Sequence, residues 1–558
     1  MTPRYILGIS AGGESGAALF EHGRLVRAVN EERLSRKKMD TDFPLRSIDW
    51  CLRSAGLTAA DIGRIAYGFS AVQPDGPLFP ELFLRLKDYV ADAEAMAVIL
   101  DRLRSEHEVD HGKRQEFFQR TGALFPGVPI HLCPHHDAHR AAAFRTSPFS
   151  RALIVTADGR GDYKSLTLSQ GERGQAFREL SCAYSWESLG YFYGRMTALA
   201  GFTGNRHEGK LTGLAAHGDP QVARDLVERM ITLEDNRLRS FPGTWYRPFF
   251  SNFSPELLAA AARYRREDLA AAAQWWLERL VTQPLAHWVE QTGVRDICLA
   301  GGVFANIKLN QRIRELPGVD NVFVYPNMGD AGICAGAVYD LLGDAAESGP
   351  LPHLYLGPVL DPVALAEGLR SRGVAVRQPP DPFAEAVLVL QQGALVGLVQ
   401  GAGEFGPRAL GHRSILASPA YPAIGDTINR RLHRDGFMPL APVIGAELAA
   451  ACLRGYREEH LSARHMTMCY DATEALAESA AAIVHVDGTV RPQVVFSRDE
   501  PVLHALLARW HGQTGGLALI NTSYNMHEEP IVNDHLDVLH AFDQGAVDYL
   551  LFPPYFAG

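Results

Sequence analysis

The stretch "YILGISAGGESGAALFEHGRLVRAVNEE" (residues 5–32) decides the fold of the N-terminal part of the chain. It opens with an apolar, β-prone run, turns in the glycine-rich segment 11–16, and returns as a second apolar strand. A strand–turn–strand unit of this kind can hold a nucleotide phosphate with its main-chain N–H groups. We therefore expect Gly12 and Gly13 to contact a bound nucleotide.

A similar unit appears at residues 152–170, "ALIVTADGRGDYKSLTLSQ", where an apolar strand enters an Asp/Gly turn and a second strand follows. Two such units in one chain indicate a duplicated ATP-binding fold of the actin/sugar-kinase type. The alternative is two unrelated hairpins. Asp158 and Gly159 of this turn join the expected nucleotide-binding residues.

A third glycine turn lies in "CLAGGVFANIKLN" (residues 298–310), where Gly301 and Gly302 follow an expected strand and precede a helix. Main chain can approach a nucleotide closely there, and the helix N-terminus favours an anion. Asn306 shares a face of this helix with Asn310. Together with the two earlier turns, this segment predicts ATP binding.

Composition excludes several classes of protein. The chain has 558 residues, of which 47% are hydrophobic and 21% charged, which is typical of soluble globular proteins. A net charge of −10 argues against nonspecific nucleic-acid binding, since phosphate contacts need surplus Lys and Arg. No apolar run reaches about 20 residues, so no membrane span is expected. The start does not resemble a signal peptide, and the seven scattered cysteines suit reduced thiols, so we expect a cytoplasmic protein.

The chain divides at a proline- and glycine-rich stretch, residues 343–362. We predict a first α/β domain at 1–345, a linker at 346–362, and a second α/β domain at 363–558. Apolar residues at helical spacing around 80–120 and 220–290 predict helical insertions in the first domain.

The segment "CPHHDAHRAAAF" (residues 133–144) is the sharpest local signal. His135 and His139 are four residues apart, so they share one face of a helix and suit one first-row metal ion. His131 and His136 crowd the same region, so spacing does not fix the pair. The alternative is a polar helix start facing solvent. Asp330 offers an anionic ligand, but nothing in the spacing connects it to the histidines.

Two further groups carry charge among small residues. In "HEGKLTGLAAHG" (residues 207–218), Glu208 and Lys210 are candidates to orient an acceptor and to neutralise phosphate, or they form an exposed charge pair. In the C-terminal domain, arginines on glycine-rich turns, with amide and hydroxyl side chains, predict an oxyanion pocket rather than surface arginines. Its candidates are Arg408, Arg413, Arg491, Asn521 and Ser523.

Ten ordered motifs closely resemble the NodU/CmcH family of carbamoyltransferases over nearly the whole chain. They include "NEERLSRKK", "HHDAH", "DGRGD", "EGKLTGLAAHG", "AGGVFANIKLN", "EFGPRALGHRSIL" and "HVDGTVRPQ". The resemblance implies an N-terminal module similar to the tRNA-threonylcarbamoyl transferases of the actin-like ATPase (ribonuclease-H-like) superfamily. It implies a C-terminal module like the YrdC fold.

The resemblance also implies site residues. It selects His135, His139 and Asp330 as ligands of a metal, often iron or another divalent ion. It places carbamoyl phosphate at Arg408, Arg491 and Asn521, with Arg413. In the implied reaction, carbamoyl phosphate and ATP with Mg²⁺ give carbamoyl-AMP. The carbamoyl group then passes to a hydroxyl or amine of a small molecule, such as an antibiotic, nucleoside or sugar scaffold. We expect a monomer or homodimer that binds neither nucleic acid nor membrane.

The chain departs from the family pattern twice. Glu14-Ser15 stands where the family has His-Asp, so Glu14 becomes the candidate base. Met438 stands where an arginine is expected, and Arg430, Arg431 or Arg434 could compensate. The competing hypotheses are a nucleotide-binding pseudoenzyme, a transferase of another group such as sulfamoyl, and tRNA threonylcarbamoylation, which the acidic charge disfavours.

Overall fold

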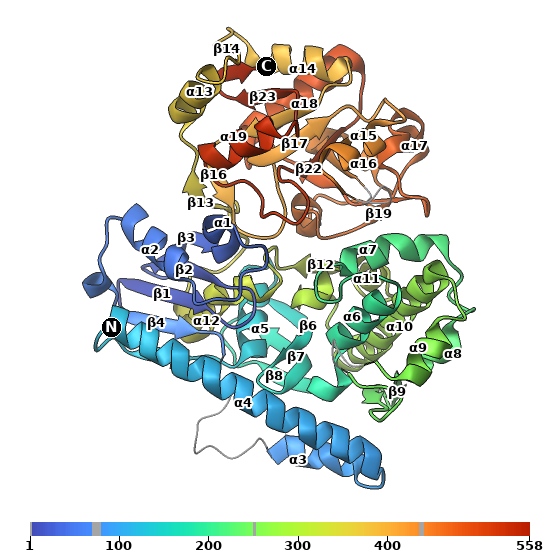
Figure 1. Cartoon of the computed structure of the whole chain (residues 1–558). Helices are drawn as coiled ribbons and strands as arrows, with labels where there is room; N and C mark the ends of the chain where they lie inside the picture. The colour runs from blue at the N-terminus through green and yellow to red at the C-terminus, as the bar shows by residue number, and fades with distance from the viewer. Residues whose placement is uncertain (1–2, 70–79, 249–252, 435–439) are drawn as a thin grey trace. The chain divides into compact units, whose positions relative to one another are not determined.

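The computed structural model describes residues 3–69, 80–248, 253–434 and 440–558. The chain is a mixed α/β protein that forms two units (Figure 1). The first comprises Met1–Val26, Thr41–Pro44 and Ile48–Pro350, and the second comprises Arg27–Asp40, Leu45–Ser47 and Leu351–Gly558. The main division thus falls inside the stretch 346–362 that composition marks as a linker.

The first unit contains two five-stranded sheets with the same strand order. The first runs β3(Arg24–Asn30)-β2(Gly16–Glu21)-β1(Tyr5–Ser10)-β4(Arg64–Tyr67)-β5(Ile130–Leu132). The second runs β8(Arg178–Tyr184)-β7(Lys164–Glu172)-β6(Arg151–Gly161)-β11(Asp296–Ala300)-β12(Asn321–Val324). In each sheet the central strand, β1 or β6, pairs antiparallel with the strand after it. On its other side it pairs parallel with β4 or β11.

Two helices lie between these sheets and bring the site together. Helix α12 (Ile333–Leu342) packs on β1, β2 and β4, helix α5 (His135–Arg145) packs on β6, β7 and β11, and the two helices pack on each other. They approach through small residues. A Cβ on Gly336 would lie 2.2 Å from the Ala138 carbonyl oxygen, so only glycine permits this spacing. The close contact fixes the start of α5 against the turn before α12.

Helices flank the sheets, and those near residues 80–120 and 220–290 lie where the apolar spacing predicts helical insertions. The first insertion contains α3(Pro80–Leu86) and the long helix α4(Ala93–Leu124), and the second contains α8(Arg224–Glu228), α9(Pro255–Ala261) and α10(Arg266–Thr292). Outside these two stretches lie α6(Leu189–Leu199), α7(Glu208–Leu214) and α11(Ile307–Arg314). One part of the helical prediction is wrong. Residues 231–240 form a hairpin of β9(Ile231–Glu234) and β10(Arg237–Ser240). Asp235 and Asn236 adopt φ of 49° and 60° there, which favours a tight hairpin turn over a helix.

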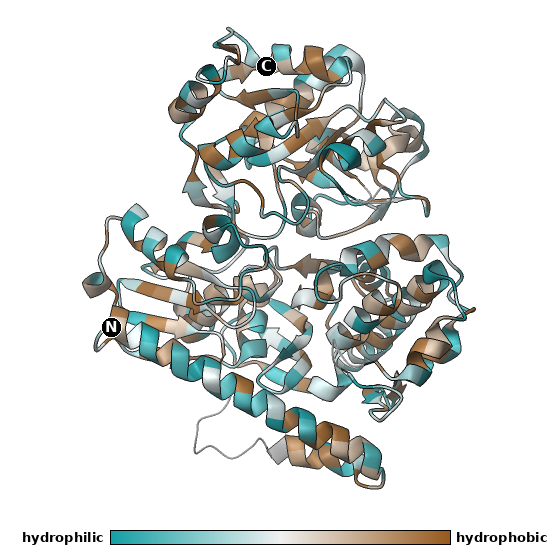
Figure 2. Cartoon of the chain, in the orientation of Figure 1, coloured by the Kyte–Doolittle hydropathy of each residue, from teal (hydrophilic) through white to brown (hydrophobic). Residues whose placement is uncertain are grey.

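The second unit is built on an eight-stranded sheet, whose inner strands are largely hydrophobic (Figure 2). Its order is β14(Val376–Arg377)-β24(Tyr555–Ala557)-β23(Tyr549–Phe552)-β15(Val396–Val399)-β17(Arg413–Ala417)-β22(Leu519–Ser523)-β18(Ala441–Gly445)-β21(Gln493–Val495). Its longer helices are α13(Pro362–Arg370), α14(Pro382–Gln391), α15(Ile424–Arg431), α18(Pro501–Thr514) and α19(His535–Asp543). Strands β15, β17 and β22 bury Leu398, Leu416 and Leu519 against Leu506 and Trp510 of α18.

A short N-terminal segment belongs to the second unit. Helix α1 (Glu31–Ser35) lies in it, and Arg33 Nη2 donates to the Gly406 carbonyl oxygen at 2.7 Å. Arg36 donates to the carbonyl oxygens of Pro530 and Ile531 at 2.9 and 2.8 Å. The "NEERLSRKK" motif thus anchors this segment on the second unit. No helix in the described part of the chain has the length and apolar character needed to cross a membrane.

Candidate metal centre and arginine cluster

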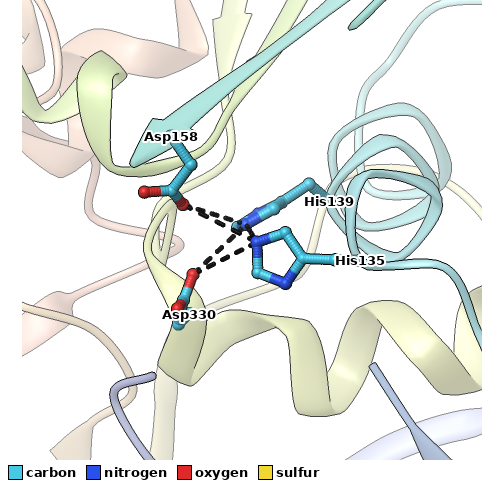
Figure 3. Close-up of side chains that lie close together, drawn as sticks. All are labelled: His135, His139, Asp158 and Asp330. Atoms are coloured by element: carbon cyan, nitrogen blue, oxygen red, sulfur yellow. Dashed lines mark hydrogen bonds and ion pairs between the residues drawn. The ribbon is translucent and has the colours of Figure 1, made fainter. Parts of the chain in front are cut away.

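Two imidazoles and two carboxylates converge in the first unit (Figure 3). His135 and His139 project from the first turns of α5, Asp158 lies near the end of β6, and Asp330 precedes α12. The two Nε2 atoms are 3.2 Å apart. Asp330 Oδ1 lies 3.5 Å from each of them, and Asp158 Oδ2 lies 3.3 Å from His139 Nε2 and 3.9 Å from His135 Nε2.

The electrostatics of this centre favour a cation. Burial and the nearby Asp158 raise the pKa of Asp330. Burial opposes a charged His139, but the carboxylates of Asp158 and Asp330, 3.3 and 3.5 Å from its Nε2, outweigh it and raise the pKa of His139 to about 9. Asp330 Oδ1 is buried without a hydrogen bond. Two neutral imidazoles and two carboxylates are a donor set that first-row divalent ions accept, so these residues fit a metal.

Three glycines that the sequence predicts to bind nucleotide pack directly on the ligands. The N–H groups of Gly159 and Gly302 donate to the carboxylate of Asp158 at 2.7 and 3.2 Å. A Cβ on Gly13 would lie 1.7 Å from Asp330 Oδ2. These three glycines therefore orient the carboxylates of the centre. Their role toward a nucleotide stays a prediction.

Glu14 also lies beside the centre. A Cβ built on Gly329, the residue before Asp330, would lie 3.2 Å from Glu14 Oε2. Ser10 Oγ donates to the carbonyl oxygens of both Glu14 and Asp330, at 3.0 and 2.7 Å, and so ties the two turns together. The candidate base is thus next to the ligand turn.

A cavity of about 230 Å³ opens on the centre, and Asp158 and Asp330 form part of its wall. Its other lining residues are Ala11, Gly12, Tyr67, Phe69, Asp110, Lys113, Arg114, Gly159, Arg160, Asp162, Tyr191 and Asn205. Carboxylates, cations and aromatic rings all face this space, so it suits a polar small molecule.

Four predicted residues have other surroundings and do not line this cavity. Asn306 caps α11, because its Oδ1 accepts the Leu309 N–H at 3.0 Å. Gly301 adopts φ of 100°, where glycine is favoured, in the turn after β11. Glu208 accepts the N–H of Asn205, which does line the cavity, and burial raises the pKa of Glu208. Lys210 is buried, with its ammonium 6.0 Å from the centroid of the Phe202 ring.

A cluster of arginines lies in the second unit. Burial, and then the charge of Arg491, lower the pKa of Arg408 to about 9 and that of Arg434 to about 10. Burial also lowers the pKa of Arg491. Among the residues that the structure describes, none of these three forms an ion pair with a carboxylate. The cluster therefore holds excess positive charge that an anion would neutralise.

Hydrogen bonds position Arg434 within the cluster. It donates to Thr522 Oγ1 at 2.7 Å, to Ser523 Oγ at 3.2 Å and to Asn525 Oδ1 at 3.3 Å. Asn521, on the same strand β22, has a buried Oδ1 without a hydrogen bond. Met438 lies outside the described residues. The sequence suggested Arg434 only as one of three substitutes for the missing arginine, and the structure brings it to the predicted pocket residue Ser523.

Arg413 differs from the other predicted pocket residues. Its side chain is 1% exposed, and its guanidinium donates to main-chain carbonyl oxygens at 2.6 to 3.2 Å. These acceptors are Pro358, Gln400, Gly401, His412 and Asn533. All five N–H donors are thereby used. Arg413 thus ties its own strand to the segments around Pro358, Gln400 and Asn533, and it has no free donor for an anion.

Comparisons with known proteins identify the family over both units of the chain. Residues 5–76 and 125–339 match the family model "Carbamoyltransferase N-terminus", and residues 387–557 match "Carbamoyltransferase C-terminus". Nodulation protein NolNO of Sinorhizobium fredii is 32% identical over 561 residues, which cover 97% of this chain and 78% of that protein. Nodulation protein NolO of Bradyrhizobium diazoefficiens is 33% identical over 439 residues, which cover 75% of this chain and 78% of that protein.

Among solved structures, full-length HypF in its phosphate- and nucleotide-bound form aligns with a TM-score of 0.32 and 13% identity, over 61% of this chain and 56% of that chain. This likeness is too weak to carry an argument. The two family models together span most of the sequence, and NolNO matches it almost from end to end. The chain therefore belongs to the carbamoyltransferase family, and it is a carbamoyl-transferring enzyme.

Proposed function

We propose that this enzyme makes carbamoyl-AMP from carbamoyl phosphate and ATP, and passes the carbamoyl group to a hydroxyl or amine of a small-molecule natural product. The observation that carries this proposal is the cluster of Arg408, Arg434 and Arg491, whose positive charge no described carboxylate neutralises. A dianion such as carbamoyl phosphate would do so with charge-assisted hydrogen bonds. The acceptor would be an antibiotic, nucleoside or sugar scaffold.

Each unit has its own part in this proposal. The equal strand order of the two sheets supports a duplicated actin-like ATPase fold for residues 1–345, which would bind ATP with Mg²⁺ and the adenylate. A YrdC-like fold for residues 363–558 would form the adenylate. We further expect a cytoplasmic monomer or homodimer.

The arginine cluster would act first. Arg408, Arg434 and Arg491 bind carbamoyl phosphate, and Asn521 offers its unpaired Oδ1 to the carbamoyl amine. Water splits the donor into carbamate and phosphate, and the carbamate oxygen attacks the α-phosphorus of ATP. Pyrophosphate leaves with the electron pair of the broken P–O bond, and carbamoyl-AMP remains.

The centre of the first unit would act second. His135, His139, Asp158 and Asp330 would hold a divalent ion such as Fe²⁺, which would supply Lewis acidity. The cavity beside them would hold the acceptor and restrict water, which would otherwise hydrolyse the adenylate. Glu14 would take the proton of the attacking hydroxyl, the new bond would form at the carbamoyl carbon, and AMP would leave.

Two variants test this division of labour. Arg491→Ala should abolish the pyrophosphate release that depends on carbamoyl phosphate, whereas Arg498→Ala, which removes an exposed arginine of the same unit, should not. His139→Ala should remove the metal and block transfer while pyrophosphate release continues. Equal loss of both steps in His139→Ala would contradict the two-site scheme. ATP binding without turnover in the unmodified protein would favour a nucleotide-binding pseudoenzyme.

A further inference from the structure

One wall of the cavity comes from a segment outside the family match. The match to "Carbamoyltransferase N-terminus" stops at residue 76 and resumes at 125. Within that gap the structure describes α3 and α4, and α4 is the long helix of the first unit (Figure 1). Asp110, Lys113 and Arg114 of α4 line the cavity together with the ligands Asp158 and Asp330. A segment that the family model does not match therefore faces the metal centre.

Part-buried ion pairs attach α4 to the end of strand β6, which carries Asp158. Arg160, two residues beyond that ligand, donates to both carboxylate oxygens of Asp110 at 2.7 and 2.9 Å. Arg160 also lies 3.7 Å from the carboxylate of Glu106, which is 1% exposed and bonded to Arg102. A bidentate pair of this kind fixes orientation as well as distance. The helix is thus held in one position relative to the metal centre.

These pairs leave two cations of α4 without a carboxylate. The ammonium of Lys113 donates to the Gly12 carbonyl oxygen, and partial burial, followed by the charge of Arg160, lowers the pKa of Lys113. Arg114 has a buried Nη1 without a hydrogen bond, and its guanidinium lies 5.4 Å from the centroid of the Phe118 ring. Within the described ranges, neither side chain forms an ion pair. Both side chains line the cavity, so an anion bound there could form ion pairs with them.

We propose that residues 80–124 are the acceptor-recognition element, and that Lys113 and Arg114 bind an anionic group of the acceptor, a carboxylate or a phosphate ester. This inference rests on the proposed function. The donor is common to the family, so residues of the matched part would bind it. The acceptor is the substrate that varies between such enzymes, and α4 lies in the part of the chain that the family model leaves unmatched. The α-phosphate of the adenylate is the other anion that could occupy the site, and the test separates the two.

The test measures binding to the full-length protein by isothermal titration. The probes are D-glucuronate as carboxylate, D-glucose as its neutral match, and AMP for the adenylate phosphate. The test variant is the double substitution K113Q/R114Q. The control is K87Q/R104Q, which removes the same charge from exposed positions of the same insertion. Circular dichroism checks that both variants fold.

The unmodified protein should bind glucuronate at least tenfold more tightly than glucose. K113Q/R114Q should lose that preference and keep its AMP affinity within about threefold, and the control should match the unmodified protein. Equal affinity for glucuronate and glucose, or no binding of either, overturns the proposal. A loss confined to AMP assigns the cations to the adenylate and also overturns it. Carbamoyl-phosphate-dependent pyrophosphate release, measured in parallel, reports separately on the proposed function.

Discussion

Gly161→Ala should disrupt the metal centre without changing any ligand. Gly161 ends β6, and its φ lies outside the left-handed region, so alanine is allowed by the backbone. The new Cβ would lie 2.0 Å from Cγ and 2.1 Å from Cδ2 of His135, whereas ordinary contacts begin at 3.4 Å. The imidazole would have to retreat by about 1.4 Å, or β6 would have to move with Asp158.

The surroundings of His135 make that retreat costly. Its main-chain N–H donates to Asp162 Oδ2 at 2.7 Å and holds the start of α5 in place, and the centroid of the Phe69 ring lies 4.6 Å from that of the imidazole. Metal–ligand distances tolerate only about 0.2 Å of change. Disturbing a group that orients a ligand lowers metal affinity by about 10- to 100-fold. That corresponds to about 1.4 to 2.7 kcal/mol of binding free energy.

The assay is an anaerobic titration of the full-length protein with Co²⁺, followed by visible absorption. Gly159→Ala is the matched control, because a Cβ there meets only the Tyr191 ring, at 3.5 Å. We expect Gly161→Ala to bind Co²⁺ at least tenfold more weakly than the unmodified protein and Gly159→Ala to bind it equally well. Equal affinity in both variants would refute the assignment of His135 as a ligand.

Three further predictions concern stability and pH. Arg413→Met leaves five carbonyl oxygens without their buried donor. It should therefore lower the free energy of unfolding of the second unit by about 3–5 kcal/mol, which a urea titration would measure. Burial opposes a charged Glu500, but its 2.8 Å bond to His412 outweighs this and lowers its pKa below 4.5. The folded state then binds fewer protons than the unfolded state, so this contribution is present above pH 4.5 and is lost as the pH falls through the lowered pKa. Glu500→Gln should reduce the loss of stability below pH 4.5, which melting temperatures measured across that pH range would show. Gly336→Ala should push α5 away from α12, and so weaken Co²⁺ binding and lower the melting temperature. Gly209→Ala, where a Cβ meets nothing within 4 Å, should change neither quantity.

The sequence predicted three residues of the metal centre but not the fourth, Asp158. Spacing placed His135 and His139 on one helical face, and the family resemblance added Asp330. Asp158 was expected only in a nucleotide-binding turn, because its approach to His135 and His139 depends on how β6 packs on α5, which residue spacing does not show. A signal was available: Asp158 is an acidic residue in a glycine turn directly after a buried strand, as a ligand loop requires. Its role toward a nucleotide is still an expectation.

Arg408 and Arg413 show why the local sequence pattern could not identify the anion-binding residues of the second unit. Arg408 and Arg413 both follow glycines in one motif, and both were expected to bind the same anion. The structure distinguishes the two arginines by their hydrogen bonds. The guanidinium of Arg413 donates to main-chain carbonyl oxygens such as those of Pro358 and Asn533. Those acceptors are main-chain atoms, which any sequence supplies. No residue pattern can therefore mark a guanidinium whose five donors are already used.

The two sites carry excess charge of opposite sign, negative in the first unit and positive in the second. This difference supports separate roles for them. In the first unit two close carboxylates raise the pKa of His139, so a proton partly compensates the excess negative charge. In the second unit burial, and then the charge of Arg491, lower the pKa values of Arg408 and Arg434, and no described carboxylate compensates the excess positive charge. Uncompensated buried charge destabilises a fold unless a ligand completes it. Since a cation would complete the first site and an anion the second, one ligand cannot serve both. This difference in charge is what the two proposed steps, formation and transfer of an adenylate, would require.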